Sequence, residues 1–281
     1  MALRGRDDMI ASLENVSKVF TNPRTGKGLV ALNDVSMDVG EGDFLCLIGP
    51  SGCGKSTTLN LLAGFELPTS GRVMFKGKEI VGPSPERGVV FQEFSLYPWM
   101  TVMQNVAFSV SKGRTKEERE ALAMKQLELV GLSDFAHARP NELSGGMKQR
   151  VAIARALAMD ADLLLMDEPF GSLDEQTRRK MDNEVLRLWE GRGKTVVFVT
   201  HSIEEALMLG TRILLMSASP GRIDREWKVG TPWPRDPTSP GMVALKKEIS
   251  RGLQVCSCAN GAPKAAFVEV QGADDRPEME V

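Results

Sequence analysis

Residues 43–65, with the sequence "DFLCLIGPSGCGKSTTLNLLAGF", decide the fold of this 281-residue chain. The apolar run over residues 44–48 is typical of a short buried strand, and a helix is expected to begin near Lys55. Strand, glycine-rich loop and helix in this order form the first unit of an α/β fold. The loop matches G-x-x-x-x-G-K-[ST], in which backbone N–H groups and the lysine surround phosphates while the hydroxyl reaches Mg²⁺. The sequence therefore predicts a nucleotide site made by Gly49, Pro50, Ser51, Gly52, Cys53, Gly54, Lys55, Ser56 and Thr57.

The rest of the chain alternates strand and helix patterns, which predicts a mostly parallel sheet covered by helices. Short β segments are expected at 10–20 and 29–39, and further buried strands at 88–92, 162–169, 195–201 and 212–217. Apolar residues recur at helical spacing over 115–131, where one face carries Ala123, Leu127 and Val130. The same spacing occurs over 174–191, where one face carries Met181, Val185, Leu188 and Trp189. This second helix is expected to stop at Gly191. A helical insertion over about 98–155 interrupts the series.

The pattern weakens beyond residue 235, where "VGTPWPRDPTSPG" is rich in proline and turn residues. A short helix is expected over about 241–253, within a C-terminal extension of 236–254. Residues 255–281 are small, polar and acidic, and we expect them to be disordered. We therefore expect one domain over 9–235, followed by this extension and tail.

Composition excludes several classes of protein. The formal net charge is −2, so the chain lacks the basic excess of a nucleic-acid-binding protein, and no nucleic-acid partner is expected. Its apolar runs are far shorter than the ~20 residues that span a bilayer. Acidic residues near the N-terminus stand where a secretory signal has an apolar core. We expect a cytosolic protein that reaches a membrane only through a partner.

Four polar residues lie at the ends of predicted strands: Asp167, Glu168, Gln92 and His201. In open parallel sheets ligands gather at the carboxyl ends of the strands, so we expect these side chains to surround the phosphates. Asp167 and Gln92 are candidate Mg²⁺ ligands together with Ser56, and Glu168 is the candidate base for the attacking water. A single histidine is more often structural, but in this set His201 is better interpreted as a contact to the γ-phosphate.

A second candidate anion site is "LSGGMKQR" at residues 143–150. Two adjacent glycines before a helix expose backbone N–H groups, and the helix is expected over 147–159. The stretch has a serine but no lysine of its own to hold a phosphate.

Together these residues resemble the ATP-binding cassette (ABC) family, the ATPase subunits of ABC transporters. The similarity extends over about 10–235 and includes the Walker A loop (49–56), Gln92, the signature "LSGGM" (143–147), Walker B (163–167), Glu168, the D-loop "SLD" (172–174) and His201. The resemblance implies a P-loop NTPase fold in class α/β, with a mostly parallel core sheet, an N-terminal antiparallel β subdomain and a helical signature subdomain.

The resemblance also implies a role for the second anion site. In this family two cassettes meet head to tail, so Ser144, Gly145, Gly146 and Met147 of one chain would contact the ATP held by Lys55 of the other. We therefore expect a homodimer with ATP and Mg²⁺ at its interface. Asp174 would link the two sites, and Phe20 would stack on adenine.

Cys53 lies inside the phosphate loop near a helix N-terminus, a setting that can lower the pKa of a thiol. We expect thiol alkylation to block ATP hydrolysis and bound ATP to protect against it.

Residues 93–108 bring Phe94, Leu96, Tyr97, Trp99 and Met100 close together in sequence. Such a cluster is usually part of a core. In the ABC family the same region forms a groove for a coupling helix of the membrane subunit, which makes a docking surface the alternative.

"LYPWMTVMQNVAF", "MDEPFGSLDEQTR" and "PWPRDPTSPGMVALKKEI" resemble cassettes of the nitrate/sulfonate/taurine importers. This resemblance implies an ATPase on the cytoplasmic face of the inner membrane, driving uptake of a small anion through a separate permease fed by a periplasmic-type solute-binding protein. The alternatives are an exporter or lipid-linked transporter, and a soluble ABC ATPase acting on ribosomes or DNA. The single cassette and the lack of a long coiled-coil insertion disfavour the soluble class.

Overall fold

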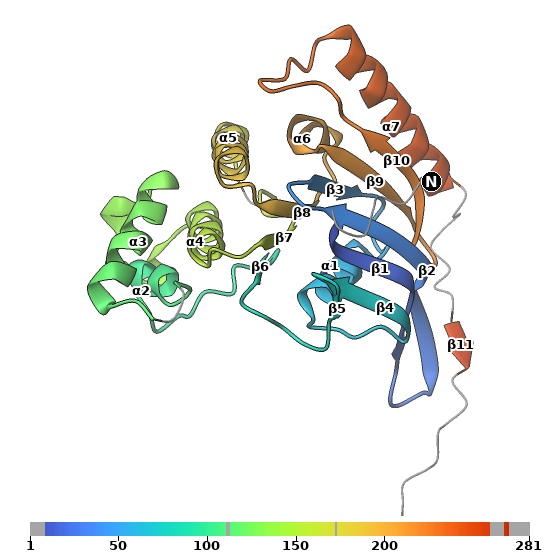
Figure 1. Cartoon of the computed structure of the whole chain (residues 1–281), viewed down its shortest axis with the longest axis horizontal. Coiled ribbons are helices and arrows are strands. Elements are labelled where there is room, and N and C mark those ends of the chain that lie inside the picture. Colours follow the sequence, from blue (N-terminus) through green and yellow to red (C-terminus); the bar gives the residue numbers. More distant parts are fainter. Residues whose placement is uncertain (1–8, 111–112, 172, 259–266, 270–281) are drawn as a thin grey trace, which may run out of the picture.

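A six-stranded sheet forms the centre of the protein, and the apolar run 44–48 lies in its middle (Figure 1). The structure is a computed structural model that describes residues 9–110, 113–171, 173–258 and 267–269. In these residues the sheet has the order β10-β9-β3-β8-β7-β6. Its strands are β3 (Phe44–Ile48), β6 (Arg87–Val90), β7 (Leu163–Asp167), β8 (Thr195–Val199), β9 (Arg212–Ser217) and β10 (Arg222–Lys228).

The strands β9, β3, β8, β7 and β6 are parallel, and β10 at the edge is antiparallel to β9. The mostly parallel sheet predicted from the sequence is therefore confirmed. Because the side chains of a strand alternate between faces, Phe44, Cys46 and Ile48 pack into one hydrophobic cluster and Leu45 and Leu47 into another. The carboxyl ends of the parallel strands lie at one edge of the sheet, where a ligand is expected.

An antiparallel sheet packs beside the core sheet, in the order β11-β2-β1-β4-β5. It comprises β1 (Met9–Thr21), β2 (Lys27–Gly40), β4 (Ser70–Phe75), β5 (Lys78–Glu79) and β11 (Phe267–Glu269). Helix α1 (Lys55–Ala63) lies between the two sheets in Figure 1, and its buried leucines share one cluster with β1, β2 and β3. The N-terminal antiparallel β subdomain is thus present.

The helical insertion projects to one side of the core sheet, next to β6 and β7 (Figure 1). It contains α2 (Val102–Ala107), α3 (Lys116–Leu129), two 3₁₀ turns (Ser133–Phe135 and Pro140–Glu142) and α4 (Gly145–Ala158). The helix face predicted by Ala123, Leu127 and Val130 is buried. Within the described residues, no helix is long and apolar enough to cross a membrane.

Helices α5 (Glu175–Arg192) and α6 (Ile203–Leu209) follow β7 and β8, and α7 (Pro240–Cys258) ends the main body. Met181 and Val185 are buried on the predicted face of α5, and Trp189 packs against the same cluster; the side chain of Leu188 lies outside the described residues. Helix α5 ends at Arg192 with Gly193 in the left-handed conformation, so the stop predicted at Gly191 is two residues early.

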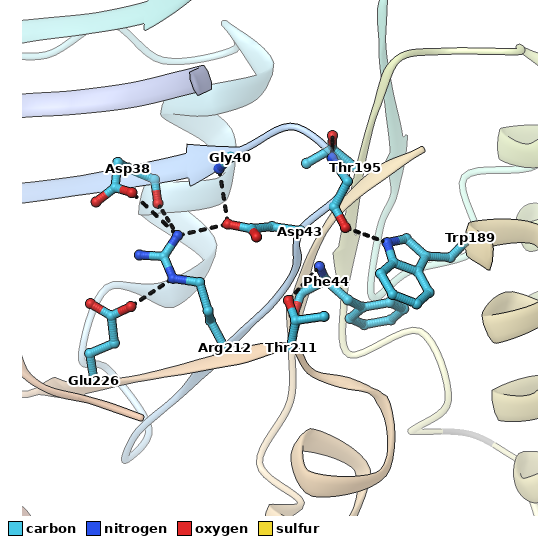
Figure 2. A network of polar contacts seen from close by, with 10 residues as sticks. Asp38, Gly40, Asp43, Phe44, Trp189, Thr195, Thr211, Arg212 and Glu226 are labelled. Atoms are coloured by element: carbon cyan, nitrogen blue, oxygen red, sulfur yellow. Dashed lines mark hydrogen bonds and ion pairs between the residues drawn. The ribbon is translucent and has the colours of Figure 1, made fainter. Parts of the chain in front are cut away.

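A buried ion cluster joins the antiparallel sheet to the core sheet (Figure 2). On β9, the Arg212 guanidinium lies 2.6 Å from Glu226 on β10, 2.8 Å from Asp43 and 3.3 Å from Asp38 on β2. It also donates to the Asp38 carbonyl at 3.0 Å. Burial opposes the charged form, but the hydrogen bonds to Glu226 and Asp43 and the negative charges of Asp38 and Glu226 together outweigh burial and raise the pKa of Arg212. Beside this cluster, Trp189 donates to the Gly42 carbonyl at 2.9 Å.

The C-terminal extension is held to the core by Arg235 and Trp233. The Arg235 guanidinium stacks on the Trp233 ring at 3.7 Å and donates to the carbonyls of Leu207 (2.6 Å) and Gly210 (2.7 Å). Burial lowers the pKa of Arg235 to about 10. The Trp233 ring lies 5.0 Å from the Trp189 ring. These contacts fix the chain just before α7.

The C-terminal part departs from the sequence-based expectation. Helix α7 covers residues 240–258 rather than 241–253, and β11 pairs with β2 over Leu29–Lys27. The expectation of disorder from residue 255 is therefore wrong for residues 255–258 and 267–269. The rest of the tail, 259–266 and 270–281, lies outside the described residues.

Candidate functional site

The phosphate loop links β3 to α1, as its sequence predicts. Lys55 is the first residue of α1, and its Nζ donates to the carbonyls of Gly49 (2.8 Å) and Pro50 (3.2 Å). Gly54 has φ +92°, and a Cβ there would lie 2.5 Å from Leu32 Cδ2. Glycine is required at this position both by the backbone conformation and by the close packing.

Asp167 ends β7 next to this loop. Burial raises the pKa of the Asp167 carboxyl, and a hydrogen bond from Ser56 partly opposes the shift. Glu168 raises this pKa further and Lys55 lowers it. The two candidate Mg²⁺ ligands, Ser56 and Asp167, are therefore already in contact with each other.

Glu168 and His201 meet at the carboxyl ends of β7 and β8. Glu168 Oε2 lies 3.2 Å from His201 Nδ1. The Glu168 N–H donates to the Val199 carbonyl at 2.9 Å, and its φ is +44°, a rare conformation for a residue with a side chain. The His201 side chain is 67% exposed, so the structure brings the pair together at an accessible edge rather than in the core.

Cys53 differs from the sequence-based expectation. Cys53 is fully buried. Burial raises the pKa of the Cys53 thiol, and the nearby Lys55 does not compensate. The expectation of a lowered thiol pKa is wrong, because Cys53 is buried in a hydrophobic cluster that also contains Leu32 and Met216. Its Sγ lies 3.7 Å from Lys55 Nζ.

Gly221, which the sequence did not indicate as a site residue, packs closely against the phosphate loop. A Cβ on Gly221, at the end of the β9–β10 connection, would lie 2.3 Å from the Cys53 carbonyl oxygen and 2.8 Å from that of Ala31. Any larger residue at Gly221 would therefore push on the phosphate loop. Its only sequence signal is the turn "SPGR", which is common in loops.

Gln92 is exposed and lies two residues beyond the end of β6, so the predicted strand 88–92 is too long. Gln92 follows β6, which lies next to β7 in the sheet, since Val90 pairs with Met166. This places Gln92 at the same sheet edge as Asp167 and Glu168. Its expected role as an Mg²⁺ ligand stays a prediction.

The segment after Gln92 is a surface loop. Trp99 is 68% exposed and Phe108 is 60% exposed, and the Tyr97 ring lies between them at 5.6 Å and 5.1 Å. None of the five apolar residues singled out in this segment, Phe94, Leu96, Tyr97, Trp99 and Met100, is fully buried. Leu96 packs against the core, as the core interpretation predicts, whereas Trp99 is exposed and forms an aromatic patch with Tyr97 and Phe108.

Asn105 organises that patch, and sequence reasoning missed it. Its side chain is buried on α2, accepts from the Tyr97 N–H at 2.8 Å, and donates to the carbonyls of Tyr97, Met100 and Thr101 at 3.2, 3.3 and 3.0 Å. A further exposed aromatic, Phe65 after α1, stacks on Phe91 at 5.5 Å, directly before Gln92.

The signature motif begins helix α4. Ser144 is the N-cap, and its Oγ accepts from the Met147 N–H at 3.3 Å. Gly145 and Gly146 are the first two helical residues, so the predicted helix start at Met147 is two residues late. Ser144 and Gly145 are exposed at this N-terminus, while Met147 packs against the core. The motif thus presents backbone N–H groups outward, with its own chain's Lys55 on a different element.

The signature helix contacts the loop that follows Gln92. Arg155 donates to the Ser95 carbonyl at 2.6 Å and lies 5.8 Å from the Tyr97 ring. A Cβ on Gly145 would lie 3.7 Å from the Phe94 ring. The loop after Gln92 and α4 are therefore in direct contact.

Asp174 of the D-loop is the N-cap of α5 and accepts from the Thr177 N–H at 2.9 Å. Hydrogen bonds from Thr177 lower the pKa of this exposed carboxyl. Ser172 of the D-loop lies outside the described residues. Phe20, near the end of β1, is 38% exposed, and Lys18 Nζ lies over its ring at 4.9 Å. Its expected stacking on adenine stays a prediction.

Comparisons with known proteins agree with this arrangement. The ABC transporter family model matches residues 32–171. The chain is 47% identical over 250 residues to an uncharacterized ABC transporter ATP-binding protein, MJ0412, of Methanocaldococcus jannaschii, covering 88% of this chain and 93% of that protein. It is 50% identical over 219 residues to the taurine import ATP-binding protein TauB of Roseobacter denitrificans, covering 78% and 81%.

Two solved structures of the bacterial ABC transporter cassette MJ0796 also match, one described as dimeric and one as a post-hydrolysis state bound to ADP and Pi. Each gives a TM-score of 0.72 at 36% identity and covers 79% of this chain and 99% of that one. The fold, the order of the motifs and these similarities lead to one conclusion: the chain belongs to the ABC transporter family, as an ATP-binding subunit.

Proposed function

We propose that this chain hydrolyses ATP as a homodimer and thereby drives import of a small anion through a separate membrane permease. The observation that supports it most is the convergence of Lys55, the Ser56–Asp167 contact and the Glu168–His201 pair at one edge of the core sheet. Each of these residue types has a distinct task in phosphoryl transfer to water.

The loop and the strand end fit a nucleotide with Mg²⁺. The Ser56 hydroxyl and the Asp167 carboxylate are hard oxygen donors, which Mg²⁺ prefers, and Gln92 adds an amide oxygen at the same edge. Lys55 now donates to two neutral carbonyls. An ammonium group binds a charged phosphate more strongly than a neutral carbonyl, so Lys55 would move to the phosphates. A Mg²⁺ ion held by Ser56 and Asp167 would neutralise negative charge that builds up on the phosphates during hydrolysis.

Glu168 would accept the proton of the attacking water. As the new oxygen–phosphorus bond forms, the bond from the γ-phosphorus to the β-phosphate oxygen breaks, and the proton passes to the carboxylate. His201, 3.2 Å from Glu168, would hold the carboxylate in place and reach the γ-phosphate. A fixed donor at the site of developing charge lowers the barrier because it needs no reorganisation.

A second copy of the chain would complete each site. The exposed N-terminus of α4, with Ser144 and the N–H groups of Gly145 and Gly146, is suited to an anion but has no cation of its own. The dimeric structure of the MJ0796 cassette supports a homodimer. A head-to-tail arrangement would bring this N-terminus to the phosphate loop of the other copy. ATP would then favour the closed dimer, and hydrolysis would release it.

Transport would use the exposed aromatic patch. Tyr97, Trp99 and Phe108 lie just after Gln92, and an exposed apolar patch indicates a binding surface. We place a permease helix there, on the cytoplasmic face of the membrane, with a periplasmic-type solute-binding protein acting on the permease. The names of the TauB relatives support taurine or a related anion as the solute.

The ATPase part of the proposal is tested with Glu168→Gln and Lys55→Ala. We expect Glu168→Gln to bind ATP, to hydrolyse it about 10²–10⁴-fold more slowly, and to accumulate as a dimer with ATP and Mg²⁺ in gel filtration. Lys55→Ala should lose tight nucleotide binding. A Glu168→Gln variant with wild-type turnover, or one that stays monomeric while the wild type dimerises, would contradict the role of Glu168.

The transport part is tested by a tagged pull-down from gently solubilised membranes. A multi-span permease together with a solute-binding protein would support import. A permease alone would favour an exporter, and ribosomal or DNA-repair partners without a permease would contradict transport altogether.

A further inference from the structure

A chain of polar contacts leads from the D-loop to helix α6. Arg178, in the first turns of α5, donates through one terminal nitrogen to the Leu173 carbonyl at 3.1 Å. Its Nε lies 3.5 Å from Glu205 Oε1 on α6; this contact is an ion pair, because the buried Nε has no hydrogen-bond partner among the described residues. The guanidinium is two-thirds buried and the Glu205 side chain is 11% exposed, so this pair is shielded from solvent. The D-loop backbone at Leu173 is thus connected to α6 through one side chain.

The same chain of contacts continues to the end of β8. The second carboxylate oxygen of Glu205, Oε2, accepts a short hydrogen bond from the Thr200 hydroxyl. Thr200 is buried, immediately precedes His201, and its hydroxyl also accepts from the Ser202 N–H at 3.0 Å. Because Thr200 and Ser202 flank His201, Glu205 is hydrogen-bonded to the segment that carries the histidine.

Asp182 lies one turn beyond Arg178 on the same helix, and Arg178 stabilises its negative charge only in part. Its Oδ1 is buried and has no hydrogen-bond partner among the described residues. Burial and then the nearby Glu205 raise the pKa of Asp182 to about 7, and Arg178 lowers it only in part. The buried Cys46 thiol on β3 is a further titratable group near Asp182 and Glu205.

A groove between α5, α6 and the start of α7 gives solvent access to Asp182. Besides Arg178, Asp182 and Glu205, its charged lining consists of Glu175, Arg179, Glu204 and Lys246. These four form two exposed ion pairs, Arg179–Glu175 at 2.7 Å and Lys246–Glu204 at 2.5 Å. The carboxyl with the raised pKa, Asp182, therefore lines a groove whose other walls carry these paired charges.

We propose that Arg178 and Glu205 are positioning residues for ATP hydrolysis, which couple the D-loop at Leu173 to His201, and that the proton on Asp182 controls this coupling. The proposal rests on the proposed function, because His201 affects turnover only if ATP is hydrolysed beside Glu168. The D-loop and His201 lie on different elements, and this contact chain makes their positions interdependent.

The direction of the effect follows from charge. With Asp182 protonated, one carboxylate, that of Glu205, faces the one guanidinium of Arg178. When Asp182 loses its proton, a second buried carboxylate repels Glu205 and competes for Arg178. The contact chain is therefore complete below about pH 7 and is weakened as the pH rises through that value. Turnover should fall on the alkaline side for this reason.

The test measures kcat and KM for ATP from pH 6 to 8.5 in the full chain with Mg²⁺. Asp182→Asn keeps the shape of the protonated side chain, so it should hold kcat at the acid-side value across the range. Glu205→Gln and Arg178→Lys should each lower kcat about tenfold while KM changes less than about twofold, as for residues that act at a distance. Glu204→Gln and Arg179→Lys are matched controls on the same two helices and should behave as wild type.

Thermal melts and nucleotide affinity establish that each variant is folded, and Asp182→Asn carries the test even if Arg178→Lys melts early. An Asp182→Asn profile that superimposes on that of wild type overturns the proposal, as does a Glu205→Gln variant indistinguishable from Glu204→Gln. A wild-type chain that binds ATP without hydrolysing it at any pH refutes the proposed function, and this inference with it. An active wild type with unchanged variants refutes the inference alone.

Discussion

Replacing Arg212 by methionine would remove the cation from the buried cluster that joins the two sheets. The guanidinium is 6% exposed, and the Asp38 and Asp43 side chains are 7% exposed each, with Glu226 at 18%. Methionine keeps much of the length and apolar stem of arginine, so the change acts chiefly on charge and hydrogen bonding. Three carboxylates would then face one another with no guanidinium between them (Figure 2).

The expected loss of stability is large. Removing one partner of a buried ion pair costs about 3–5 kcal/mol, because the other charge stays buried and uncompensated. For a domain of this size each kcal/mol lowers Tm by roughly 2–4 °C, which gives a decrease of about 10 °C. The carboxylates should also take up protons when the variant folds. The folded variant then binds more protons than the unfolded chain, so its stability falls as the pH rises from about 5 to 8.

Urea and thermal unfolding at pH 5 and pH 8 would test this reasoning. Arg225→Met is the control, since Arg225 lies on β10 next to Glu226 but is 49% exposed and pairs with Asp224 at 3.4 Å. An exposed pair contributes about 0–1 kcal/mol, so this control should melt near the wild type. An Arg212→Met variant that loses less than about 1 kcal/mol, or loses no more at pH 8 than at pH 5, would refute the argument.

Three further predictions concern the candidate site. Cys53 should resist alkylation by N-ethylmaleimide at pH 7 in the folded protein, with or without ATP, because its thiol is buried and its pKa is raised; peptide mass spectrometry before and after unfolding checks this. Asn105→Ala should lower permease affinity in the pull-down, and should cost about 1–3 kcal/mol of stability because the Tyr97 N–H and nearby carbonyls lose their partner. Phe20→Ala should weaken ATP binding about tenfold and leave kcat unchanged, as equilibrium titration and turnover will show, since stacking stabilises ground state and transition state alike.

Local patterns were sufficient to predict the core sheet and the phosphate loop. The run 44–48, the glycines and Lys55 are neighbours in sequence, so their geometry is largely determined by short-range preferences. The polar residues at strand ends were found for the same reason, because parallel strands bring their carboxyl ends to one edge. Element ends were less accurate: β6 stops at Val90 and α4 starts at Gly145.

Properties that depend on tertiary packing were not predictable. The sequence context of Cys53 indicates a helix N-terminus, but its burial depends on packing with residues distant in the sequence, such as Met216. Nothing in the local sequence distinguishes Asn105 from an ordinary helical residue. Its role depends on the chain path that brings the carbonyls of Tyr97 and Met100 to its side-chain amide. Asp182 likewise has no local signal, since its raised pKa comes from burial and then from Glu205, 23 positions later in the sequence.

The backbone of Glu168 has a consequence for the evolution and engineering of this protein. Its φ of +44° costs roughly 1–2 kcal/mol relative to glycine, which adopts the left-handed region freely. Glycine at this position would therefore favour a more stable chain, yet it would remove the carboxylate proposed as the base. Selection for thermal stability alone would tend to lose the carboxylate, whereas selection for turnover would keep it in this conformation. In a library of stabilised variants, those that change Glu168 should therefore be the first to be tested for ATP hydrolysis.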